Sequence, residues 1–427
     1  MKRKLTEKLT KWNREGRLPL LLQGARQVGK TYTLKEFASQ HYTGMVYVNF
    51  ELNPALHSLF DGDISPERII GYLEMHFNQK IEPGRTLLFF DEIQSCERAL
   101  TSLKYFAESD THYHLVAAGS LLGVAVNREK YSFPVGKVHM ETLFPLDFEE
   151  FLWAFDKHAL ADEIAHSFEK NMPMPEIFHH TALELFNEYV ITGGMPDVVA
   201  HYVQNRDREK LIEDKTHILN SYSADMTKYA SPAESVKIRT AFDSIPLQLA
   251  KENKKFQYKV MKKGASASHF GVAIDWLCAS GMVAKCYRVE HGYTPVAAYM
   301  DLSAFKLYMA DTGLLVQKAG LYPQTVLALQ GSFKGALMEN AVAQGLAAGG
   351  HTLYYWESIS TAEIDFVITI QGDPIPVEVK SSDHVRSRSL DVYVKRYSPS
   401  HAVRISSRNF GFHNRIRSVP LYAAHAL

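Results

Sequence analysis

Residues 24–31 read GARQVGKT and match the phosphate-binding pattern G-x-x-x-x-G-K-[ST]. The two glycines can adopt backbone angles that other residues avoid, so the N–H groups of this loop can converge on phosphate oxygens. Lys30 supplies a positive charge for the β- and γ-phosphates, and the hydroxyl of Thr31 can ligate Mg²⁺. The alternative is a chance glycine turn between a strand and a helix. We expect a site for ATP and Mg²⁺ formed by Gly24, Gln27, Val28, Gly29, Lys30 and Thr31.

Two carboxylates, Asp91 and Glu92, directly follow the apolar run Thr86–Phe90. Such a run is typical of a parallel strand buried on both faces, and ligands bind at the carboxyl ends of these strands. We expect Asp91 to hold the Mg²⁺ shell and Glu92, with Lys30, to be catalytic by orienting or polarising the attacking water. The alternative is an ordinary acidic turn after a strand.

Short apolar segments are expected to form the parallel sheet that positions these groups. One precedes the loop, a helix follows it from Tyr32, and further strands are expected at Met45–Phe50 and His114–Ala118. Ser120 follows the last of these segments, where its hydroxyl could reach the γ-phosphate. A simple strand-end turn at this position fits the sequence equally well.

A second set of charged residues lies near the C-terminus. Asp365 lies in one expected strand, Glu378 and Lys380 lie two residues apart in the next, and Glu339 lies in a preceding helix. A charge inside an apolar strand is costly unless it is paired or binds a metal. Asp365 and Glu378 on a hairpin can ligate Mg²⁺, which would polarise a phosphodiester. Lys380 could orient the attacking water or accept its proton.

The spacing of these four residues resembles the core of PD-(D/E)xK nucleases, with every position filled. The resemblance implies catalytic roles for Glu339, Asp365, Glu378 and Lys380. The alternative is a nuclease-like fold kept as a binding module, in which the charges satisfy one another as a salt-bridge network.

Basic residues gather in two stretches. Lysines recur between residues 251 and 263, with Glu252 the only acid among them. Between residues 381 and 427, Lys and Arg outnumber Asp383 and Asp391. Either stretch could contact the phosphates of DNA, or could be an ordinary solvated surface. The residues concerned are Lys251, Lys254, Lys255, Lys259, Lys262 and Lys263, then Arg386, Arg388, Lys395, Arg396, Arg404, Arg408, Arg415 and Arg417.

The composition limits the class of protein. The 427 residues are 46% hydrophobic and 22% charged, which is ordinary for a soluble globular protein of about two to four domains. The formal net charge is zero, so any binding to nucleic acid or anionic lipid must come from local patches. Three cysteines without paired spacing indicate a reducing compartment. We expect a cytoplasmic protein without a signal segment or membrane span.

A series of motifs runs along nearly the whole chain. They are the phosphate loop, Asp91-Glu92-Ile93-Gln94, Gly119-Ser120, Leu143-Phe144-Pro145-Leu146, Phe148-Glu149-Glu150-Phe151, Gly193-Gly194-Met195-Pro196, Phe305-Lys306-Leu307-Tyr308 and Asp311-Thr312-Gly313-Leu314-Leu315. In this order they resemble AAA-type ATPases that carry the C-terminal domain of unknown function 4143. The resemblance implies an ATPase core, a helical and winged-helix-like middle, and a nuclease-like end.

Two further expectations depend on this resemblance. Such proteins usually have Gly-Arg where this chain has Gly136-Lys137, and lysine lacks the planar fork that an arginine finger would use. Asn49 is a candidate to restrain Glu92 until a partner binds.

These patterns together predict an α/β fold: a P-loop ATPase core with a parallel sheet, a helical and winged-helix middle, and a nuclease-like α/β C-terminal domain. The expected boundaries are 1–150 for the AAA-type ATPase domain, 151–234 for the helical region, 235–325 for the winged-helix-like domain and 326–427 for the PD-(D/E)xK nuclease-like domain. The leading hypothesis is an ATP-hydrolysing protein that acts on DNA. The alternatives are a nucleotide-switched DNA- or protein-binding module with an inactive nuclease fold, and a motor acting on protein partners. The expected partners are ATP, DNA and further copies of the chain in a homo-oligomer, without a membrane.

Overall fold

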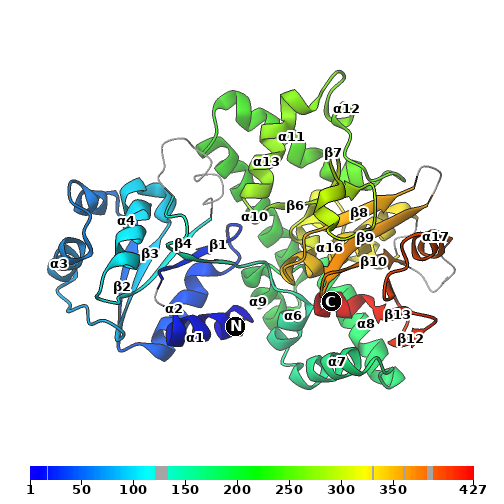
Figure 1. Cartoon of the computed structure of the whole chain (residues 1–427), viewed down its shortest axis with the longest axis horizontal. Helices are drawn as coiled ribbons and strands as arrows, with labels where there is room; N and C mark the ends of the chain where they lie inside the picture. Colours follow the sequence, from blue (N-terminus) through cyan, green and yellow to red (C-terminus); the bar gives the residue numbers. More distant parts are fainter. Residues whose placement is uncertain (17, 121–132, 329–330, 359–361, 382–387) are drawn as a thin grey trace. The chain divides into compact units, whose positions relative to one another are not determined.

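The computed structural model describes residues 1–16, 18–120, 133–328, 331–358, 362–381 and 388–427 (Figure 1). The described chain divides into two compact units. The N-terminal unit comprises Lys2–Phe144 with Ala279–Gly281, and the C-terminal unit comprises Pro145–Cys278 and Met282–Leu427. Among the described residues, none of the helices combines the length and the apolar character that a membrane crossing requires.

The N-terminal unit is built on a parallel sheet, which within the described residues has five strands in the order β2-β3-β4-β1-β5. β1 precedes the phosphate loop and lies between β4 and β5. Because all these strands run in the same direction, the loop emerges at the same edge of the sheet as the carboxyl ends of β3 and β4. The strands are β1 (Leu20–Gln23), β2 (Gly44–Asn49), β3 (Thr86–Asp91), β4 (His114–Gly119) and β5 (His139–Thr142).

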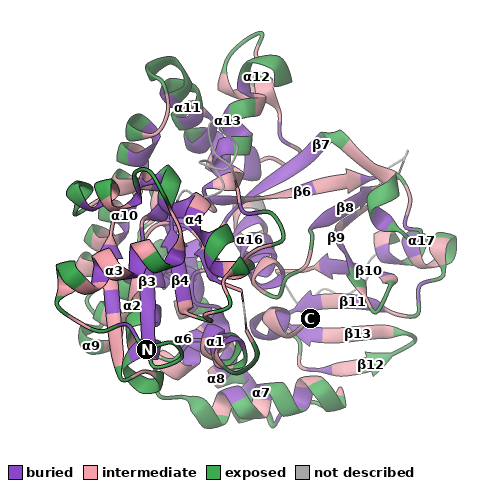
Figure 2. Cartoon of the chain, turned by 60° about the vertical axis from the view of Figure 1, so that its left-hand side comes forward, coloured by how far each residue is buried: buried purple, intermediate pink, exposed green. Residues whose placement is uncertain are grey.

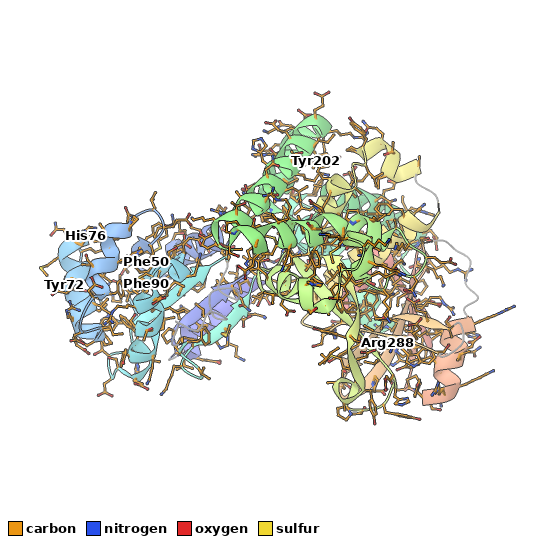
Figure 3. The ribbon with its side chains drawn as sticks, turned by 90° about the horizontal axis from the view of Figure 1, so that it is seen from above. Phe50, Tyr72, His76, Phe90, Tyr202 and Arg288 are labelled. Carbon is orange, nitrogen blue, oxygen red and sulfur yellow. The ribbon has the colours of Figure 1, made fainter. Side chains whose placement is uncertain are left out.

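The apolar core of the N-terminal unit explains the sequence of β3. Every residue of this strand is buried, as expected for a strand covered on both faces (Figure 2). Phe50 and Phe90 lie together in this core, with ring centroids 5.6 Å apart in an edge-to-face arrangement (Figure 3). The helices are α1 (Leu5–Glu15), α2 (Lys30–His41), α3 (Pro66–Phe77) and α4 (Glu97–Glu108), with the short 3₁₀ helices η1 (Pro54–Phe60) and η2 (Ile93–Ser95).

Helices dominate the first part of the C-terminal unit, as the sequence predicts. Capping boxes fix two of their starts, with Asp147 and Glu150 at α6 and with Ser231 and Glu234 at α11. The helices are α6 (Phe148–Ala154), α7 (His158–Lys170), α8 (Glu176–Thr192), α9 (Pro196–Asn205), α10 (Arg208–Lys228), α11 (Pro232–Leu249), α12 (Tyr258–Met261), α13 (Ala267–Ala279), α14 (Thr312–Lys318), α15 (Pro323–Ala328), α16 (Ser332–Ala348) and α17 (Arg388–Tyr397).

A mixed sheet forms the rest of the C-terminal unit. In the part of the chain that the structure describes it has eight strands, in the order β12-β13-β11-β10-β9-β8-β6-β7. β6 pairs with β7 antiparallel and with β8 parallel. The strands are β6 (Val283–Val289), β7 (Met300–Met309), β8 (Tyr354–Glu357), β9 (Glu363–Ile370), β10 (Asp373–Val379), β11 (Ala402–Ser406), β12 (Gly411–His413) and β13 (Ile416–Pro420), with the 3₁₀ helices η3 (Val296–Tyr299) and η4 (Leu421–Ala426).

The observed architecture confirms the predicted fold class: an α/β chain with a parallel P-loop core, a helical middle and a C-terminal sheet with helices. β6 and β7 come from the segment expected to be a winged helix, and they share one sheet with the strands of the segment expected to be nuclease-like. The division into four domains at residues 150, 234 and 325 stays a prediction.

Candidate ATP site and a buried charge cluster

The phosphate loop connects β1 to α2 and has the backbone geometry that its glycines predict. Gly24 and Gly29 have φ angles of 149° and 91°, in the region that favours glycine. A Cβ atom on Gly24 would lie 2.2 Å from the carbonyl oxygen of Leu143, so a side chain at this position would collide with the backbone. α2 begins at Lys30, and the N–H groups of a helix's first turn have no acceptor within the helix. They are therefore available to an anion at the loop.

The ammonium group of Lys30 lies inside this loop. The residue is only 6% exposed, and Nζ donates hydrogen bonds to the carbonyl oxygens of Gly24 at 2.9 Å and Ala25 at 2.8 Å. Both acceptors are neutral. Because hydrogen bonds to an anion are about twice as strong as those between neutral groups, phosphate oxygens can replace these carbonyls as acceptors.

Asp91 ends β3 and is held by two hydroxyl groups. Thr31 Oγ1 lies 2.9 Å from Asp91 Oδ2, and Tyr47 Oη lies 2.8 Å from the same oxygen. The backbone N–H of Glu92 donates to Oδ1 of Asp91 at 3.1 Å. Burial, together with the nearby charge of Asp91, raises the pKa of Tyr47 to about 12, so its hydroxyl keeps its proton at neutral pH. The structure thus brings together Thr31 and Asp91, the two residues that the sequence predicts as Mg²⁺ ligands.

Glu92 follows in the left-handed conformation, with φ of 51°. Its Oε2 accepts hydrogen bonds from Gln94 Nε2 at 2.5 Å and from Ser120 Oγ at 3.3 Å. Ser120 thus contacts the expected catalytic carboxylate, and a contact of its hydroxyl with the γ-phosphate stays a prediction. Gln94 was not among the predicted site residues, although it belongs to the Asp-Glu-Ile-Gln motif.

The expected role of Asn49 is not found among its contacts. Its Nδ2 donates to Tyr47 Oη at 3.2 Å, and its Oδ1 accepts from the backbone N–H groups of Glu51 and Leu52. The hydrogen bonds of the Asn49 side chain thus go to residues of β2 and of the turn that directly follows it. The contacts that restrain Glu92 come from Gln94 and Ser120 instead.

Two further basic residues of the N-terminal unit, Arg3 and Lys137, make defined contacts. The guanidinium group of Arg3 is buried and donates to the carbonyl oxygens of Val28 at 2.9 Å and Phe144 at 2.6 Å, so it braces the phosphate loop. This role could not be predicted from the sequence, because no local pattern marks a basic N-terminal residue as buried. Lys137, which stands where the family usually has an arginine, pairs with Glu108 at 3.0 Å.

The donor set of this site fits a nucleoside triphosphate with Mg²⁺. Loop N–H groups and Lys30 can bind phosphate oxygens, while Thr31 and Asp91 offer the oxygen ligands that Mg²⁺ requires. Glu92 lies one residue from Asp91, where it can orient a water molecule.

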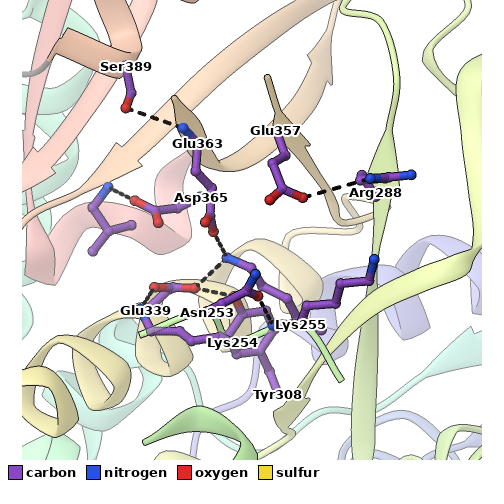
Figure 4. Close-up of polar contacts among 12 residues, drawn as sticks. Asn253, Lys254, Lys255, Arg288, Tyr308, Glu339, Glu357, Glu363, Asp365 and Ser389 are labelled. Atoms are coloured by element: carbon purple, nitrogen blue, oxygen red, sulfur yellow. Dashed lines mark hydrogen bonds and ion pairs between the residues drawn. The ribbon is translucent and has the colours of Figure 1, made fainter. Parts of the chain in front are cut away.

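A buried charge cluster lies in the C-terminal unit (Figure 4). Its centre is Glu339 on α16, whose carboxylate accepts hydrogen bonds from Lys254, from Lys306 at 3.2 Å and from the hydroxyl of Tyr308. Lys306 also pairs with Glu363 at 2.6 Å. We define the charge cluster as Lys254, Lys306, Tyr308, Glu339, Glu363 and Asp365. The sequence predicts Glu339 and Asp365 as site residues but misses the two lysines and Tyr308 as their partners.

The pKa values in the charge cluster follow from burial and from the balance of charges. Burial opposes ionisation of Glu339, but the charges of Lys306 and Lys254 outweigh it and lower its pKa to about 2. Burial alone would lower the pKa of Lys306, yet the surrounding carboxylates hold it well above its ordinary value. Burial and the charge of Glu339 raise the pKa of Asp365 to about 7. The cluster therefore keeps Glu339 and Lys306 charged, and Asp365 releases its proton at a much higher pH than Glu339 does.

The other predicted nuclease residues make separate contacts. Asp365 Oδ2 accepts a hydrogen bond from the backbone N–H of Val379 at 2.8 Å. Glu378 is buried, with Oε1 3.0 Å from Lys380 Nζ and Oε2 3.9 Å from Arg404 Nε. Within the described ranges there is no group of three or more His, Cys, Asp or Glu side chains that could hold a metal ion. The Mg²⁺ site at Asp365 and Glu378 stays a prediction that these contacts do not favour.

The basic stretches are only partly exposed. Lys254 points inward to Glu339, whereas Lys259, Lys262 and Lys263 are exposed around α12. In the C-terminal stretch, Arg417 donates to the carbonyl oxygen of Phe168 and lies over its ring. Arg386 lies outside the described residues.

The parallel strand order, the glycine loop after β1 and the acidic end of β3 define a P-loop ATPase-like fold. Comparison with known families agrees. Residues 16–152 match an AAA domain, residues 183–325 match a domain of unknown function (DUF8612), and residues 334–424 match a domain of unknown function (DUF4143). The chain therefore carries an AAA domain followed by a DUF4143 domain, as its motifs imply.

Individual relatives are distant. Uncharacterized proteins of Mycobacterium bovis and Mycobacterium tuberculosis are each 35% identical over 100 residues, and the match covers 21% of this chain and 22% of each relative. Among solved structures, a Walker-type ATPase of Pyrococcus abyssi is 16% identical, with 73% of this chain and 94% of that chain covered and a TM-score of 0.44. The RuvB Holliday junction branch migration motor of Thermotoga maritima is also 16% identical, with coverage of 66% and 89% and a TM-score of 0.32.

Proposed function

We propose that this chain binds ATP with Mg²⁺ and hydrolyses it at the loop between β1 and α2. The observation that carries the proposal is the 2.9 Å contact between Thr31 and Asp91, which are 60 residues apart in the sequence. The fold brings these two oxygen groups together beside the glycine loop, and oxygen is the ligand type that Mg²⁺ prefers. When bound, Mg²⁺ neutralises charge on the phosphate oxygens.

The protein groups divide the remaining tasks. Lys30 and the loop N–H groups bind the phosphates and stabilise the charge that develops during transfer. Glu92 orients the attacking water and accepts its proton. Because Gln94 and Ser120 both donate to Oε2 of Glu92, at least one of these hydrogen bonds has to weaken before the carboxylate can take up a proton there.

The variant Glu92→Gln tests this assignment. It keeps the size and polarity of the side chain but cannot accept a proton, so ATP hydrolysis should fall by about 10²- to 10⁴-fold while ATP binding remains. Steady-state phosphate release and equilibrium binding of ATP measure the two effects. Glu97→Gln, on the exposed first turn of α4, is the matched control and should hydrolyse ATP normally. Normal turnover in Glu92→Gln would remove Glu92 from the mechanism.

For the C-terminal unit we propose a binding module rather than a nuclease. Both carboxylate oxygens of Glu339 already accept from ammonium groups, Lys254 at one and Lys306 at the other, which supports a structural role for the charge cluster. A DNA cleavage assay with Mg²⁺ or Mn²⁺ tests the choice, and no cleavage is expected. Metal-dependent cleavage that disappears in both Asp365→Ala and Lys380→Ala would establish the nuclease instead.

We further propose that DNA is the ligand of this module and that the exposed lysines around α12 contact its phosphates. Replacing Lys259, Lys262 and Lys263 together by Ala should weaken binding and reduce the slope of log K against log salt by up to about 3. A matched triple replacement of Lys104, Lys157 and Lys170, which are also exposed, should leave the slope unchanged. Equal slopes for both triple variants would place the DNA elsewhere or exclude it.

A further inference from the structure

Tyr47 lies on β2, outside every motif that marks the phosphate loop. Its hydroxyl donates to Oδ2 of Asp91 at 2.8 Å, the same oxygen that accepts from Thr31. The strand pairing accounts for this contact, because β2 runs parallel to β3 with Asn49 directly beside Asp91. The carboxylate of Asp91 thus has a hydroxyl donor from the loop helix and a second one from the neighbouring strand.

Tyr47 is itself held from two directions. Asn49 Nδ2 donates to its hydroxyl oxygen at 3.2 Å. Lys35 Nζ lies 3.8 Å from the centroid of its ring, within the range of a cation–π interaction. Lys35 stands one turn beyond Thr31 on α2, so the helix that presents Thr31 also fixes the ring of Tyr47.

We propose that Tyr47 is a positioning residue that orients Asp91 toward the Mg²⁺ bound with ATP. The inference rests on the proposed function of this site and names a residue of it that the loop motif does not contain. A carboxylate beside a metal is usually oriented by a hydrogen-bond donor behind it, and removing such a donor typically costs about 10- to 100-fold in metal affinity or activity. Tyr47 is such a donor, and it comes from a different element than Thr31.

If the hydroxyl of Tyr47 only stabilised the fold, its removal would lower stability without changing the requirement for Mg²⁺. The side chain of Tyr47 is only partly buried, and its ring contacts Phe89 at a centroid distance of 5.1 Å. Tyr47→Phe keeps this packing and the contact with Lys35. Stability should therefore change little, while the requirement for Mg²⁺ should rise.

The test measures equilibrium binding of a fluorescent, non-hydrolysable ATP analogue as a function of Mg²⁺ concentration, so that it does not depend on turnover. In Tyr47→Phe the Mg²⁺ concentration for half-saturation should rise about 10-fold, while binding of the analogue in EDTA stays the same. Tyr42→Phe is the matched control. The hydroxyl of Tyr42 bonds to Asn13 at 2.9 Å and His114 at 2.8 Å in the same unit, so its removal should not shift the Mg²⁺ dependence.

Each outcome decides between explanations. An unchanged half-saturation in Tyr47→Phe, or an equal shift in Tyr42→Phe, would overturn the positioning role while leaving the ATP site intact. Absence of analogue binding in the unmodified chain would overturn the ATP site and the inference together, whereas binding that is independent of Mg²⁺ would overturn the inference alone. If thermal unfolding shows that Tyr47→Phe is misfolded, Lys35→Met gives the second test. It releases the ring but keeps the hydroxyl, and should shift the half-saturation in the same direction by a smaller factor.

Discussion

Lys30 and Lys306 are both almost completely buried, at 6% and 1% exposed, yet their surroundings differ. Lys30 donates to two neutral carbonyl oxygens of its own loop. Lys306 pairs with two carboxylates, one on α16 and one on β9. The first ammonium can exchange its acceptors for phosphate, whereas the second is neutralised in place. Burial of a charged side chain therefore does not by itself indicate a ligand site. What distinguishes the two lysines is whether their hydrogen-bond acceptors are neutral carbonyls or carboxylates.

The charge cluster also shows how a buried network balances itself. Lys254 and Lys306 face Glu339, Glu363 and Asp365, so two cations meet three carboxyl groups. Burial, together with the charge of Glu339, raises the pKa of Asp365 to about 7, and protonation of Asp365 returns the cluster toward neutrality. In the candidate ATP site, by contrast, the side-chain donors to the Asp91 carboxylate are the neutral hydroxyl groups of Thr31 and Tyr47. A metal ion can therefore approach this carboxylate without displacing a lysine from it.

The largest expected effect comes from removing the cation of the cluster. Lys306→Met leaves the buried Glu339 and the partly exposed Glu363 with one cation fewer, so the free energy of unfolding should fall by about 3–5 kcal/mol. Urea unfolding followed by tryptophan fluorescence measures this change. Lys210→Met, which removes an exposed ion pair on α10, should cost less than about 1 kcal/mol. If the two variants were equally stable, the description of the cluster as a structural core would be wrong.

Lys30→Met should produce the opposite pattern. ATP hydrolysis should fall by about 10²- to 10³-fold, because the variant lacks the preorganised ammonium group that would stabilise the charge of the transferred phosphoryl group. The free energy of unfolding should change by less than in Lys306→Met, since the two freed acceptors are neutral carbonyl oxygens and not carboxylates. Lys80→Met, an exposed residue of the same unit, should change neither quantity. A Lys30→Met protein with full activity would contradict the whole ATP site.

The pH dependence of stability tests the charge balance. The pKa of Asp365 is about 7 in the fold and 3.8 as its ordinary value, so between these pH values the folded state holds a proton that the unfolded chain has released. Stability from this group is therefore lost as pH rises through that window, at a slope on the order of 1 kcal/mol per pH unit. Asp365→Asn lacks this loss, so its stability relative to the unmodified chain should rise between pH 4 and 7 and then level off. Glu339 has a lowered pKa and acts in the opposite direction only below its ordinary value of 4.5. A stability difference that stays constant from pH 4 to 7 would contradict the raised pKa.

The smallest effect is expected where a buried hydrogen bond involves neutral groups. The hydroxyl of Tyr189 donates to the carbonyl oxygen of Leu146 at 2.8 Å and accepts from Gln344 at 2.8 Å. Tyr189→Phe should lower the free energy of unfolding by about 1–3 kcal/mol, because the amide of Gln344 loses its acceptor. Urea unfolding beside Tyr105→Phe, whose ring is exposed, provides the comparison. A loss as large as that of Lys306→Met would show that neutral and charged networks matter equally here.

The sequence predicted the backbone angles and the strand burial around the candidate ATP site, because these properties depend on local patterns. The glycines of residues 24–31 adopt the positive φ angles expected of them, and β3 is as fully buried as its apolar run indicates. Leu5, Leu9 and Trp12 recur at helical spacing and are buried in α1. Tyr47 was missed because its contact with Asp91 depends on strand order and not on any neighbour in the sequence.

The C-terminal prediction was less complete for the same reason. The hairpin of β9 and β10 and the helix carrying Glu339 formed where they were expected. The sequence places Lys254 among several basic residues that could face solvent or DNA, but its side chain contacts Glu339, 85 residues further along the chain. Lys306 reaches the same carboxylate across 33 residues. No periodicity within a single element encodes such a pairing.

The amino-acid sequence by itself determined which backbone angles the phosphate loop takes, which strands are apolar on both faces, and where charges interrupt them. These properties depend on side-chain type and on spacing over a few residues. Only the tertiary structure decided which partner each buried charge received: hydroxyl groups for Asp91, carbonyls for Lys30, and ammonium groups for Glu339. The physical reason is that electrostatic interactions depend on distance in space, which is set by the order of strands and the packing of helices.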